Sequence, residues 1–454
     1  MTDSVNTPSR PIDDALAIWQ QGVDSVDSEQ LVRGALKADS SSIVIGDQIL
    51  SLNSDSRIIV IGGGKAGAGM ASGIEAVMKD AGLLDRVDGW INVPEDCVRP
   101  LQRLHLHGAR PAGVNEPTQA GVGGTSEILR LIDNARDTDV CLCLISGGGS
   151  ALLPAPIDGV SLEDKQQITR LLSENGANIA QLNTVRKQLS KVKGGRLRDA
   201  CNAGQMATLV ISDVLGDPLD VIASGPTVEN STTASDALLI LQQLNLITMT
   251  PTSIISALKQ QAAEASQLNT GNTASQVHII GNIQTAVAAA TAKAKSLGYE
   301  VESIAHTSFE GEVNNVARDH ANWIQEHISS SNKRALITGG EPVVTLSDAN
   351  TRGKGGRNQQ LVLAALVEIL RDGTWPAKAV LISGGTDGED GPTDAAGAKL
   401  CTEQLQTPIS ESLEPEPYLR NNDAYHFFEQ IDGLIKTGPT HTNVCDIRVA
   451  LIGE

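Results

Sequence analysis

The stretch Val140-Cys-Leu-Cys-Leu-Ile145 runs directly into Ser146-Gly-Gly-Gly-Ser150. Its first six residues are an unbroken apolar run, which is typical of a strand buried on both faces of a parallel sheet. Three consecutive glycines leave backbone amides open to an oxyanion, and they cost more entropy than a simple tight turn requires. The stretch therefore predicts a buried strand that ends in an anion-binding turn made of Ser146, Gly147, Gly148, Gly149 and Ser150.

The same order of apolar run, turn and helical pattern recurs along the chain. The apolar runs occupy residues 57–61, 140–145, 207–211, 277–280, 334–337, 378–382 and 447–452. Strands that alternate with helices predict the α/β class, here with mostly parallel sheets covered by helices. Ligands of such sheets bind beyond the carboxyl ends of the strands, which is where glycine, lysine and aspartate gather in this sequence.

A polar stretch past the middle of the chain marks a change of domain. Residues 261–276 are rich in Ser, Thr, Asn and Gln and show little periodicity. A chain of 454 residues is also too long for one ordinary core. We expect a Rossmann-like domain over 11–250 and a second α/β domain over 276–454. The helical pattern that begins at Pro11 could pack on either domain.

The composition excludes several classes of protein. A formal net charge of -19 argues against non-specific binding to nucleic acid or to an anionic membrane. No apolar run is long enough to cross a bilayer, and the N-terminus lacks a signal-peptide pattern. Six cysteines without a C-x-x-C motif are typical of reduced core thiols. We expect a cytoplasmic protein whose partners are small molecules, and a homodimer stays open.

A second glycine turn, Gly62-Gly-Gly-Lys65, follows the strand at 57–61. A glycine loop at the start of a helix suits a phosphate or a carboxylate, and a lysine at that junction favours this interpretation. The alternative is a tight turn with a solvated lysine. Gly62, Gly63 and Gly64 are candidate binding residues, and Lys65 is a candidate catalytic residue.

Positive charge gathers between Arg186 and Arg196 in a chain that is otherwise acidic. Five cations, Lys191 among them, follow Asn183 in this stretch. The cluster is suited to the positive wall of a phosphate cleft. A solvated helix face is the alternative origin of such a run.

Carboxylates follow two of the apolar runs. Asp213 and Asp217 come after the strand at 207–211, and Asp387 lies in the acidic stretch 384–394. Such groups could hold Mg²⁺ or accept the proton of a substrate hydroxyl. The alternative is loop and helix capping, which is a common use of aspartate.

Arg357 lies close to the start of the helix that follows Gly353-Lys-Gly-Gly356. The helix dipole disfavours a cation at this end. A bound anion would explain why an arginine occupies the position.

These motifs together resemble the class II glycerate 2-kinase family, whose C-terminal part is called the MOFRL domain. The resemblance covers the chain in order from about residue 12 to residue 452. Its motifs are Gly62-Gly-Gly-Lys65, Ser146-Gly-Gly-Gly-Ser-Ala-Leu152, Asn183-Thr-Val-Arg186, Lys193-Gly-Gly195, Ser212-Asp213, Gly216-Asp217, Ala223-Ser-Gly-Pro-Thr227, Gly339-Gly-Glu341, Gly355-Gly-Arg-Asn-Gln359, Gly385-Thr-Asp-Gly388, Thr393-Asp-Ala-Ala-Gly397, Thr437-Gly-Pro-Thr440 and Thr442-Asn-Val444. In this chain His441 stands where the family usually has a small residue, often glycine, and Gln360 stands where an acidic residue is usual.

The resemblance implies two α/β domains, Rossmann-like and MOFRL-type, with an active site in the interdomain cleft. It implies transfer of the ATP γ-phosphate to the 2-hydroxyl of D-glycerate with Mg²⁺, giving 2-phosphoglycerate and ADP. The candidate catalytic residues are Lys65, Arg357, Asp213 and Lys191, and the tentative metal ligands are Asp213 and Asp387. The candidate substrate and nucleotide residues are Gly62, Gly63, Gly64, Ser146, Gly147, Gly148, Gly149, Ser150, Asn183, Arg186, Glu341, Asn358, Thr386 and Asp387.

Two rival functions stay open at this point. The run from Gly62 to Gly67 fits the dinucleotide pattern G-x-G-x-x-G by letter, so an NAD(P)H-dependent hydroxypyruvate reductase is one of them. The segment Gly89-Trp-Ile-Asn-Val93 offers no acidic residue at its end, however, and that residue belongs to the pattern. The other rival is a non-catalytic protein that binds a nucleotide or a sugar acid.

Overall fold

The computed structural model describes residues 10–111, 113, 114, 116–264 and 275–453. The chain forms two compact units, each described here by itself. One unit, Ser28–Ile280, is called the 28–280 unit. The other, called the C-terminal unit, joins the residues up to Asp27 with Gly281–Glu454.

The 28–280 unit is built on a sheet of six strands in the order β6-β5-β4-β7-β8-β9. The pairs that join β6, β5, β4, β7 and β8 are all parallel, and β4 and β7 are buried along their whole length. This agrees with the prediction of a parallel sheet made of unbroken apolar strands. The bounds are β4 Ile58–Gly63, β5 Val87–Pro94, β6 Leu104–Arg110, β7 Val140–Ile145, β8 Gln205–Ile211 and β9 Ser275–Gly281.

Further elements of the 28–280 unit cover and extend this sheet. A small antiparallel sheet comprises β1 Leu36–Ala38, β2 Ser42–Ile45 and β3 Gln48–Ser51. The helices beside the strands are α2 Ser28–Ala35, α3 Gly67–Asp80, η1 Leu84–Arg86, η2 Glu95–Cys97, α4 Gln119–Asp133, α5 Gly149–Leu152, α8 Arg196–Asp199 and η3 Ile222–Ser224.

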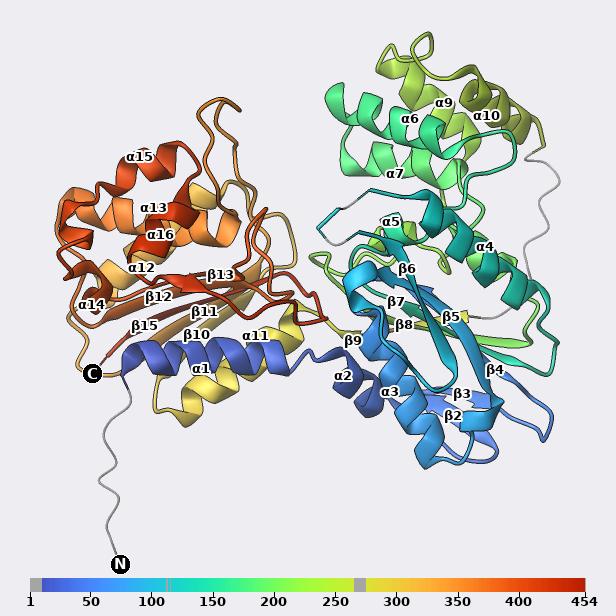
Figure 1. The fold of residues 1–454 in the computed structure, drawn as a ribbon, viewed down its shortest axis with the longest axis horizontal. Coiled ribbons are helices and arrows are strands. Elements are labelled where there is room, and N and C mark those ends of the chain that lie inside the picture. The colour runs from blue at the N-terminus through green and yellow to red at the C-terminus, as the bar shows by residue number, and fades with distance from the viewer. Residues whose placement is uncertain (1–9, 112, 115, 265–274, 454) are drawn as a thin grey trace, which may run out of the picture. The chain divides into compact units, whose positions relative to one another are not determined.

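Four helices of this unit pack on one another away from the sheet (Figure 1). We call this group the helical cap; it comprises α6 Leu162–Glu174, α7 Ile179–Gln188, α9 Ala234–Gln243 and α10 Thr252–Glu264. The cap has a hydrophobic core of its own, in which Ile168, Leu172 and Leu241 are buried. The cap is thus a separate layer that can form one wall of a cavity.

The C-terminal unit is built on a second sheet of six strands in the order β10-β11-β15-β12-β13-β14. Only β10 and β11 pair in parallel, and the other four pairs are antiparallel. The prediction of a mostly parallel sheet is therefore wrong for this unit. The bounds are β10 Glu300–Ala305, β11 Arg334–Gly340, β12 Ala379–Gly385, β13 Gly397–Leu400, β14 Leu434–Ile435 and β15 Asp446–Ile452.

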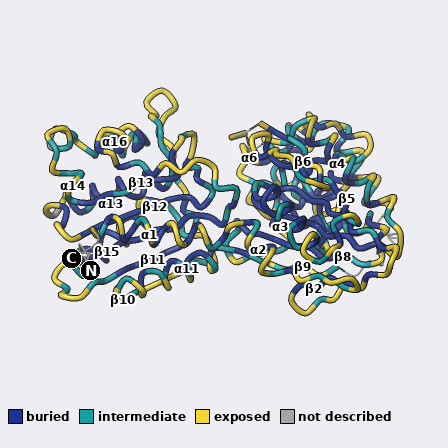
Figure 2. Tube along the Cα trace, turned by 60° about the horizontal axis from the view of Figure 1, so that its bottom comes forward, coloured by how far each residue is buried: buried dark blue, intermediate teal, exposed yellow. Residues whose placement is uncertain are grey.

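The physical reason lies in β15, which is inserted between β11 and β12 and runs against both of them. A central strand is buried on both faces whichever way it runs, so its apolar sequence does not reveal its direction. Figure 2 shows β11, β12 and β15 as mostly buried, whereas the edge strand β10 carries exposed residues.

Helices cover both faces of the second sheet (Figure 1). One face packs on α1 and α11, and the other on α12, α13 and α16, where Phe427 and Phe428 join a large apolar core. The bounds are α1 Pro11–Asp24, α11 Ile283–Ser296, α12 Val313–His327, α13 Arg357–Asp372, α14 Thr402–Leu405, η5 Ser410–Ser412, α15 Pro415–Arg420 and α16 Ala424–Gln430.

The two units differ from the predicted domains 11–250 and 276–454 at both borders. Helix α1 belongs to the C-terminal unit, because Trp19 is buried there and its indole Nε1 donates to the carbonyl oxygen of Gly384 at 3.2 Å. Strand β9 extends the first sheet instead of opening the second. Part of the polar stretch expected between the domains, 265–274, lies outside the described residues.

Each of the six cysteines is buried as a free thiol. Among the residues that the structure describes, no helix is both long and apolar enough to cross a membrane.

Candidate functional site

The two glycine turns lie against each other at the carboxyl ends of the adjacent strands β4 and β7. The Lys65 amide donates to the carbonyl oxygen of Gly147 at 2.8 Å, and the Ala66 amide donates to the Ser146 hydroxyl at 3.0 Å. A Cβ atom on Gly64 would overlap that hydroxyl. The turn after β4 therefore supports the turn after β7, and glycine is needed where their backbones meet.

The turn after β7 leads into α5 through Gly148, which has a φ of 75°. This left-handed backbone favours glycine. A Cβ atom on Gly148 would lie 3.2 Å from Arg110 Nη2 and 3.6 Å from Lys65 Cγ. The side chains of Lys65 and Arg110 therefore lie close to the turn.

A cavity of about 360 Å³ lies between this turn and the helical cap. Six of the residues predicted from the sequence line it: Gly148, Gly149, Ser150, Asn183, Arg186 and Asp213. Lys165 on α6 and Lys193 also line it, and sequence reasoning did not select either as a site residue. Gly62, Gly63, Gly64, Lys65, Ser146, Gly147 and Lys191 are not among its lining residues.

Ser150 accepts hydrogen bonds from two of the cations that line the cavity. Arg186 Nη2 donates to its hydroxyl at 2.6 Å, and Lys193 Nζ donates to the same hydroxyl at 2.8 Å and to the Ser150 carbonyl at 2.9 Å. The hydroxyl of Ser224 lies 3.2 Å from that of Ser150 and donates to Asn183 Oδ1 at 3.4 Å. This network fixes both cations at the end of the glycine turn.

Lys165 is only 9% exposed, and its Nζ has no hydrogen-bond partner among the described residues. Burial, together with the charges of Arg186 and Arg196, lowers the pKa of Lys165 to about 7. Burial also lowers the pKa of Lys193 and of Arg186. Buried charges are normally paired, and in the described part of the chain no carboxylate forms an ion pair with any of these three.

Lys191, a predicted catalytic residue, lies apart from this cavity. Its ammonium group pairs with the exposed carboxylate of Asp158 at 2.6 Å, and its side chain is 42% exposed. The neighbouring Lys187 is buried and pairs with Asp220. Within the basic run of the sequence, the structure thus separates cations that face the cavity from cations that pair elsewhere.

In the C-terminal unit, Arg357 lies at the first turn of α13, as predicted, and two carboxylates surround it. Its Nε and Nη2 donate to Asp446 at 2.6 and 3.0 Å, and its Nη1 donates to Glu341 at 2.8 Å. Burial would lower the pKa of Arg357, but Asp446 and Glu341 raise it well above its ordinary value. Protein carboxylates therefore explain this arginine, where the sequence suggested a bound anion.

Asp446 was missed by sequence reasoning. It is 1% exposed and begins β15, where it lies opposite Gly340 of β11 and Gly385 of β12. Because β15 is antiparallel to both neighbours, its first residue meets the carboxyl ends of their strands. The direction of β15 would have been needed to find Asp446, and the sequence does not give it.

Several predicted residues of the C-terminal unit hold its loops together. Asn358 is buried, and its side-chain Oδ1 accepts from the Ser383 hydroxyl at 2.6 Å. Its backbone amide donates to the buried Asp390 at 3.0 Å. The Thr386 hydroxyl donates to the Cys445 carbonyl at 2.7 Å. Asp387 accepts from the Glu389 amide at 3.1 Å.

His441, in the loop before β15, has a φ of 59°. This is the left-handed region that favours glycine. The backbone therefore accounts for the small residue that the resemblance leads one to expect at this position.

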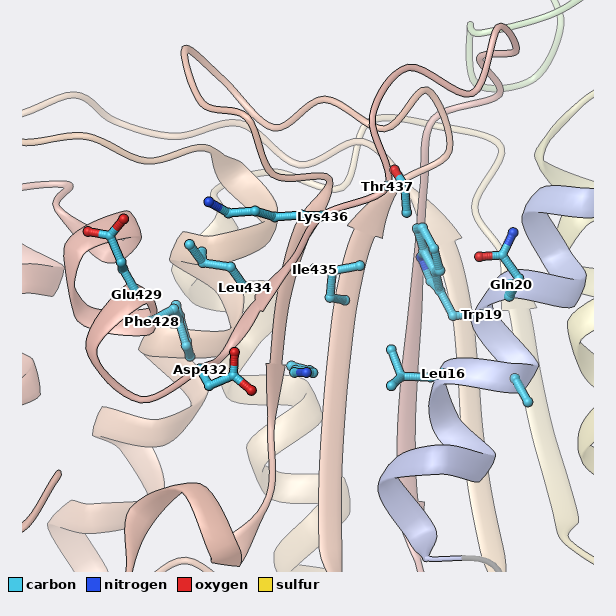
Figure 3. Close-up of a pocket in the computed structure, with 12 residues that line it drawn as sticks. Leu16, Trp19, Gln20, Phe428, Glu429, Asp432, Leu434, Ile435, Lys436 and Thr437 are labelled. Carbon is cyan, nitrogen blue, oxygen red and sulfur yellow. The ribbon is translucent and has the colours of Figure 1, made fainter. Parts of the chain in front are cut away.

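A larger cavity, about 750 Å³, lies between α1 and the β13–β14 edge of the second sheet. Figure 3 shows Leu16, Trp19 and Gln20 on one side of it and the segment from Leu434 to Thr437 on the other. Lys436 on this side pairs with Asp394 at 2.9 Å. No residue predicted for the site lines this cavity, so the smaller cavity is the stronger candidate.

Few side chains of the site are suited to binding a metal ion. Within the described ranges, no group of three or more His, Cys, Asp or Glu residues could hold a metal ion. Asp213 does line the candidate cavity. Mg²⁺ is usually held by one or two carboxylates together with water and substrate phosphates, so a single carboxylate is chemically compatible with this ion.

Comparisons with known proteins agree with this architecture. Residues 14–259 match the family model of DUF4147, a domain of unknown function, and residues 334–446 match the MOFRL family. A glycerate kinase from Mus musculus is 34% identical over 96% of this chain and 92% of its own length. A D-glycerate 2-kinase from Thermotoga maritima is 35% identical over 93% of this chain and 97% of its own.

Solved structures give the same result. The crystal structure of a glycerate kinase from Thermotoga maritima has a TM-score of 0.80 at 33% identity and covers 97% of this chain and 99% of that one. A protein from Pyrococcus horikoshii also has a TM-score of 0.80, at 31% identity, and covers 99% of this chain and 100% of that one. The chain therefore belongs to the glycerate 2-kinase family, in which a DUF4147 domain is joined to a MOFRL domain.

Proposed function

We propose that the protein transfers the γ-phosphoryl group of ATP to the 2-hydroxyl of D-glycerate, giving 2-phosphoglycerate and ADP. The observation that carries this proposal is the cavity beside the glycine turn. It is lined by the buried Lys165 and Lys193 and the partly buried Arg186, and none of these three forms an ion pair with a carboxylate among the described residues. The names of the relatives, glycerate kinase and D-glycerate 2-kinase, supply the reaction. We place the enzyme in the cytoplasm, where its buried free thiols would stay reduced.

The chemistry needs positioning and positive charge more than covalent catalysis. Arg186 and Lys193, fixed by Ser150, would bind phosphate oxygens. The amides of Gly147 and Gly148 would donate to the same oxyanions, because they donate to no acceptor among the described residues. Lys65, beside Gly148, would neutralise charge that develops on the transferred group.

Asp213, which lines the cavity, is our candidate for the metal ligand or for the group that orients the 2-hydroxyl. Asp387 of the C-terminal unit is the second candidate ligand. Mg²⁺, when bound there, would offset the negative charge of the phosphate groups. In the same unit, Asp446 and Glu341 would hold the Arg357 guanidinium in one orientation for substrate.

The reaction is tested by a coupled assay with D-glycerate, ATP and Mg²⁺. Enolase and pyruvate kinase are supplied and phosphoglycerate mutase is left out. Pyruvate should form, because enolase accepts the 2-phosphate directly. Formation of pyruvate only after mutase is added would mean transfer to the 3-hydroxyl. Oxidation of NADH or NADPH by hydroxypyruvate, with no pyruvate in the kinase assay, would replace the kinase by the reductase.

Replacing Lys65 by Ala should lower kcat by about a hundredfold or more, since the site would lose a charge that acts on the transition state. The matched control is Lys79→Ala, an exposed lysine in the last turn of α3. Both variants should unfold at nearly the wild-type denaturant concentration. Near-normal turnover by Lys65→Ala would remove this residue from the mechanism.

A further inference from the structure

The cavity beside the glycine turn combines buried positive charge with an exposed apolar wall. We propose that it is the nucleotide site: the phosphate chain lies against Lys165, Arg186 and Lys193, and the base lies against the start of α7. The inference rests on the proposed kinase function and adds which substrate this cavity takes.

Charge favours the nucleotide over the acceptor. Lys165 and Lys193 are buried and Arg186 is partly buried, so each ammonium or guanidinium group needs an anion to offset its desolvation. A glycerate ion carries a single carboxylate, whereas a nucleotide phosphate chain carries several negative charges along its length. The cavity therefore matches a polyanion.

Helix α7 runs along the cavity and lines it with an apolar side chain as well as polar and charged ones. Ile179, Asn183 and Arg186 line it from one helix face, at spacings of four and three residues. Ile179 and Arg186 are seven residues apart, which is about 10 Å along the helix axis. Ile179 is 63% exposed although it is large and apolar, so it offers a surface to an aromatic base.

Helix α6 presents a similar face. Leu162, Lys165 and Thr169 line the cavity at spacings of three and four residues. Lys165 is held by no other side chain, so its ammonium group is available to a phosphate oxygen. Lys165 forms no ion pair with a carboxylate among the described residues.

Equilibrium binding to the full chain tests the site. The probes are ADP, inorganic tripolyphosphate, adenosine and D-glycerate, each titrated with Mg²⁺ present. Lys165→Met should weaken ADP and tripolyphosphate by about tenfold or more while leaving adenosine and glycerate unchanged. Lys165→Arg should retain most of the affinity for ADP.

A further variant tests the apolar end of the cavity, and another serves as the control. Ile179→Ser should weaken ADP and adenosine but not tripolyphosphate. Lys259→Met, the same change at an exposed lysine of α10, should bind all four probes as the wild type does. Thermal unfolding of each variant shows whether a loss of binding reflects a loss of fold.

The possible outcomes distinguish failure of this inference from failure of the proposed function. If Lys165→Met weakens glycerate and spares ADP, the cavity is the acceptor's carboxylate site and the inference is wrong. Wild-type affinity of Lys165→Met for ADP also overturns it, even if the enzyme makes 2-phosphoglycerate. If ADP binding depends on Lys165 but no phosphoglycerate forms, the nucleotide site stands and the proposed function fails.

Discussion

The ammonium group of Lys165 lies in the cavity wall at a cost to the stability of the fold. Its pKa falls from 10.5 in the unfolded chain to about 7 in the folded protein. Between these values the unfolded state binds more protons, so the free energy of unfolding rises with pH across this window. The cost is fully present below pH 7 and disappears as the pH rises through 10.5.

Lys165→Met should therefore stabilise the ligand-free protein by roughly 1–4 kcal/mol near pH 6, because an unpaired buried charge is replaced by an apolar chain of similar length. The advantage should shrink as the pH approaches 10. Urea unfolding of both proteins from pH 6 to 10 measures it. Parallel pH profiles for the two proteins would show that Lys165 titrates normally in the folded state.

Asp446→Asn should destabilise the protein by roughly 3–5 kcal/mol and lower kcat, because Arg357 loses a buried bidentate partner. Glu368→Gln removes the partly exposed partner of Arg371 and should change stability by less than about 0.5 kcal/mol. Denaturant unfolding measures the change in stability, and the coupled assay measures kcat. Equal stability of the two variants would mean that Glu341 alone suffices to hold Arg357.

At this scale the sequence predicted the residues that its motifs contain and missed those that packing selects. Arg186, Ser150 and Asn183 line the cavity, and they could be predicted because they lie in or beside the glycine and basic motifs. Lys165 stands in an ordinary amphipathic helix, and nothing in its neighbours indicates that this helix faces a cavity. Its role depends on the tertiary position of the cap.

At the level of elements, the two glycine turns depend on the backbones of β4 and β7 lying in register. Gly64→Ala should destabilise the 28–280 unit by several kcal/mol and abolish activity, because its methyl group would overlap the Ser146 hydroxyl. Gly34→Ala in α2 meets open space and should be neutral or stabilising by about 1 kcal/mol. Thermal unfolding and the coupled assay distinguish them, and a fully active Gly64→Ala would contradict the close packing of the turns.

Much of the first sheet could be predicted because β4, β7 and β8 are apolar runs that the sequence assigned to the first domain. The second sheet could be predicted only as a set of strands. The direction of β15 depends on the path of the loop that precedes it, where His441 and Cys445 adopt positive φ. Such a path is fixed by tertiary contacts, as when the Thr442 hydroxyl donates to the carbonyl of Val26 at 2.6 Å.

For the whole molecule, the main finding is that α1 and the C-terminal sheet form one unit although more than 250 residues separate them in sequence. Trp19→Ala should destabilise this unit by roughly 3–5 kcal/mol, since a buried indole would be lost. Hydrogen exchange followed by mass spectrometry should show faster exchange in β12 and β15 and unchanged exchange in β4 and β7. Gln21→Ala, exposed on the same helix, is the control, and uniform loosening of both units would contradict their independence.

The central place of β15 has a consequence for synthesis on the ribosome. The 28–280 unit is complete in sequence long before β15 emerges, so it can fold during translation. The second sheet lacks its middle strand until Ile452 has left the exit tunnel. Helix α1 is synthesised first, and the sheet surface on which it packs is incomplete until then. Nascent chains should therefore expose the apolar side of α1, including Trp19, and a chaperone that binds such helices would protect them until translation ends.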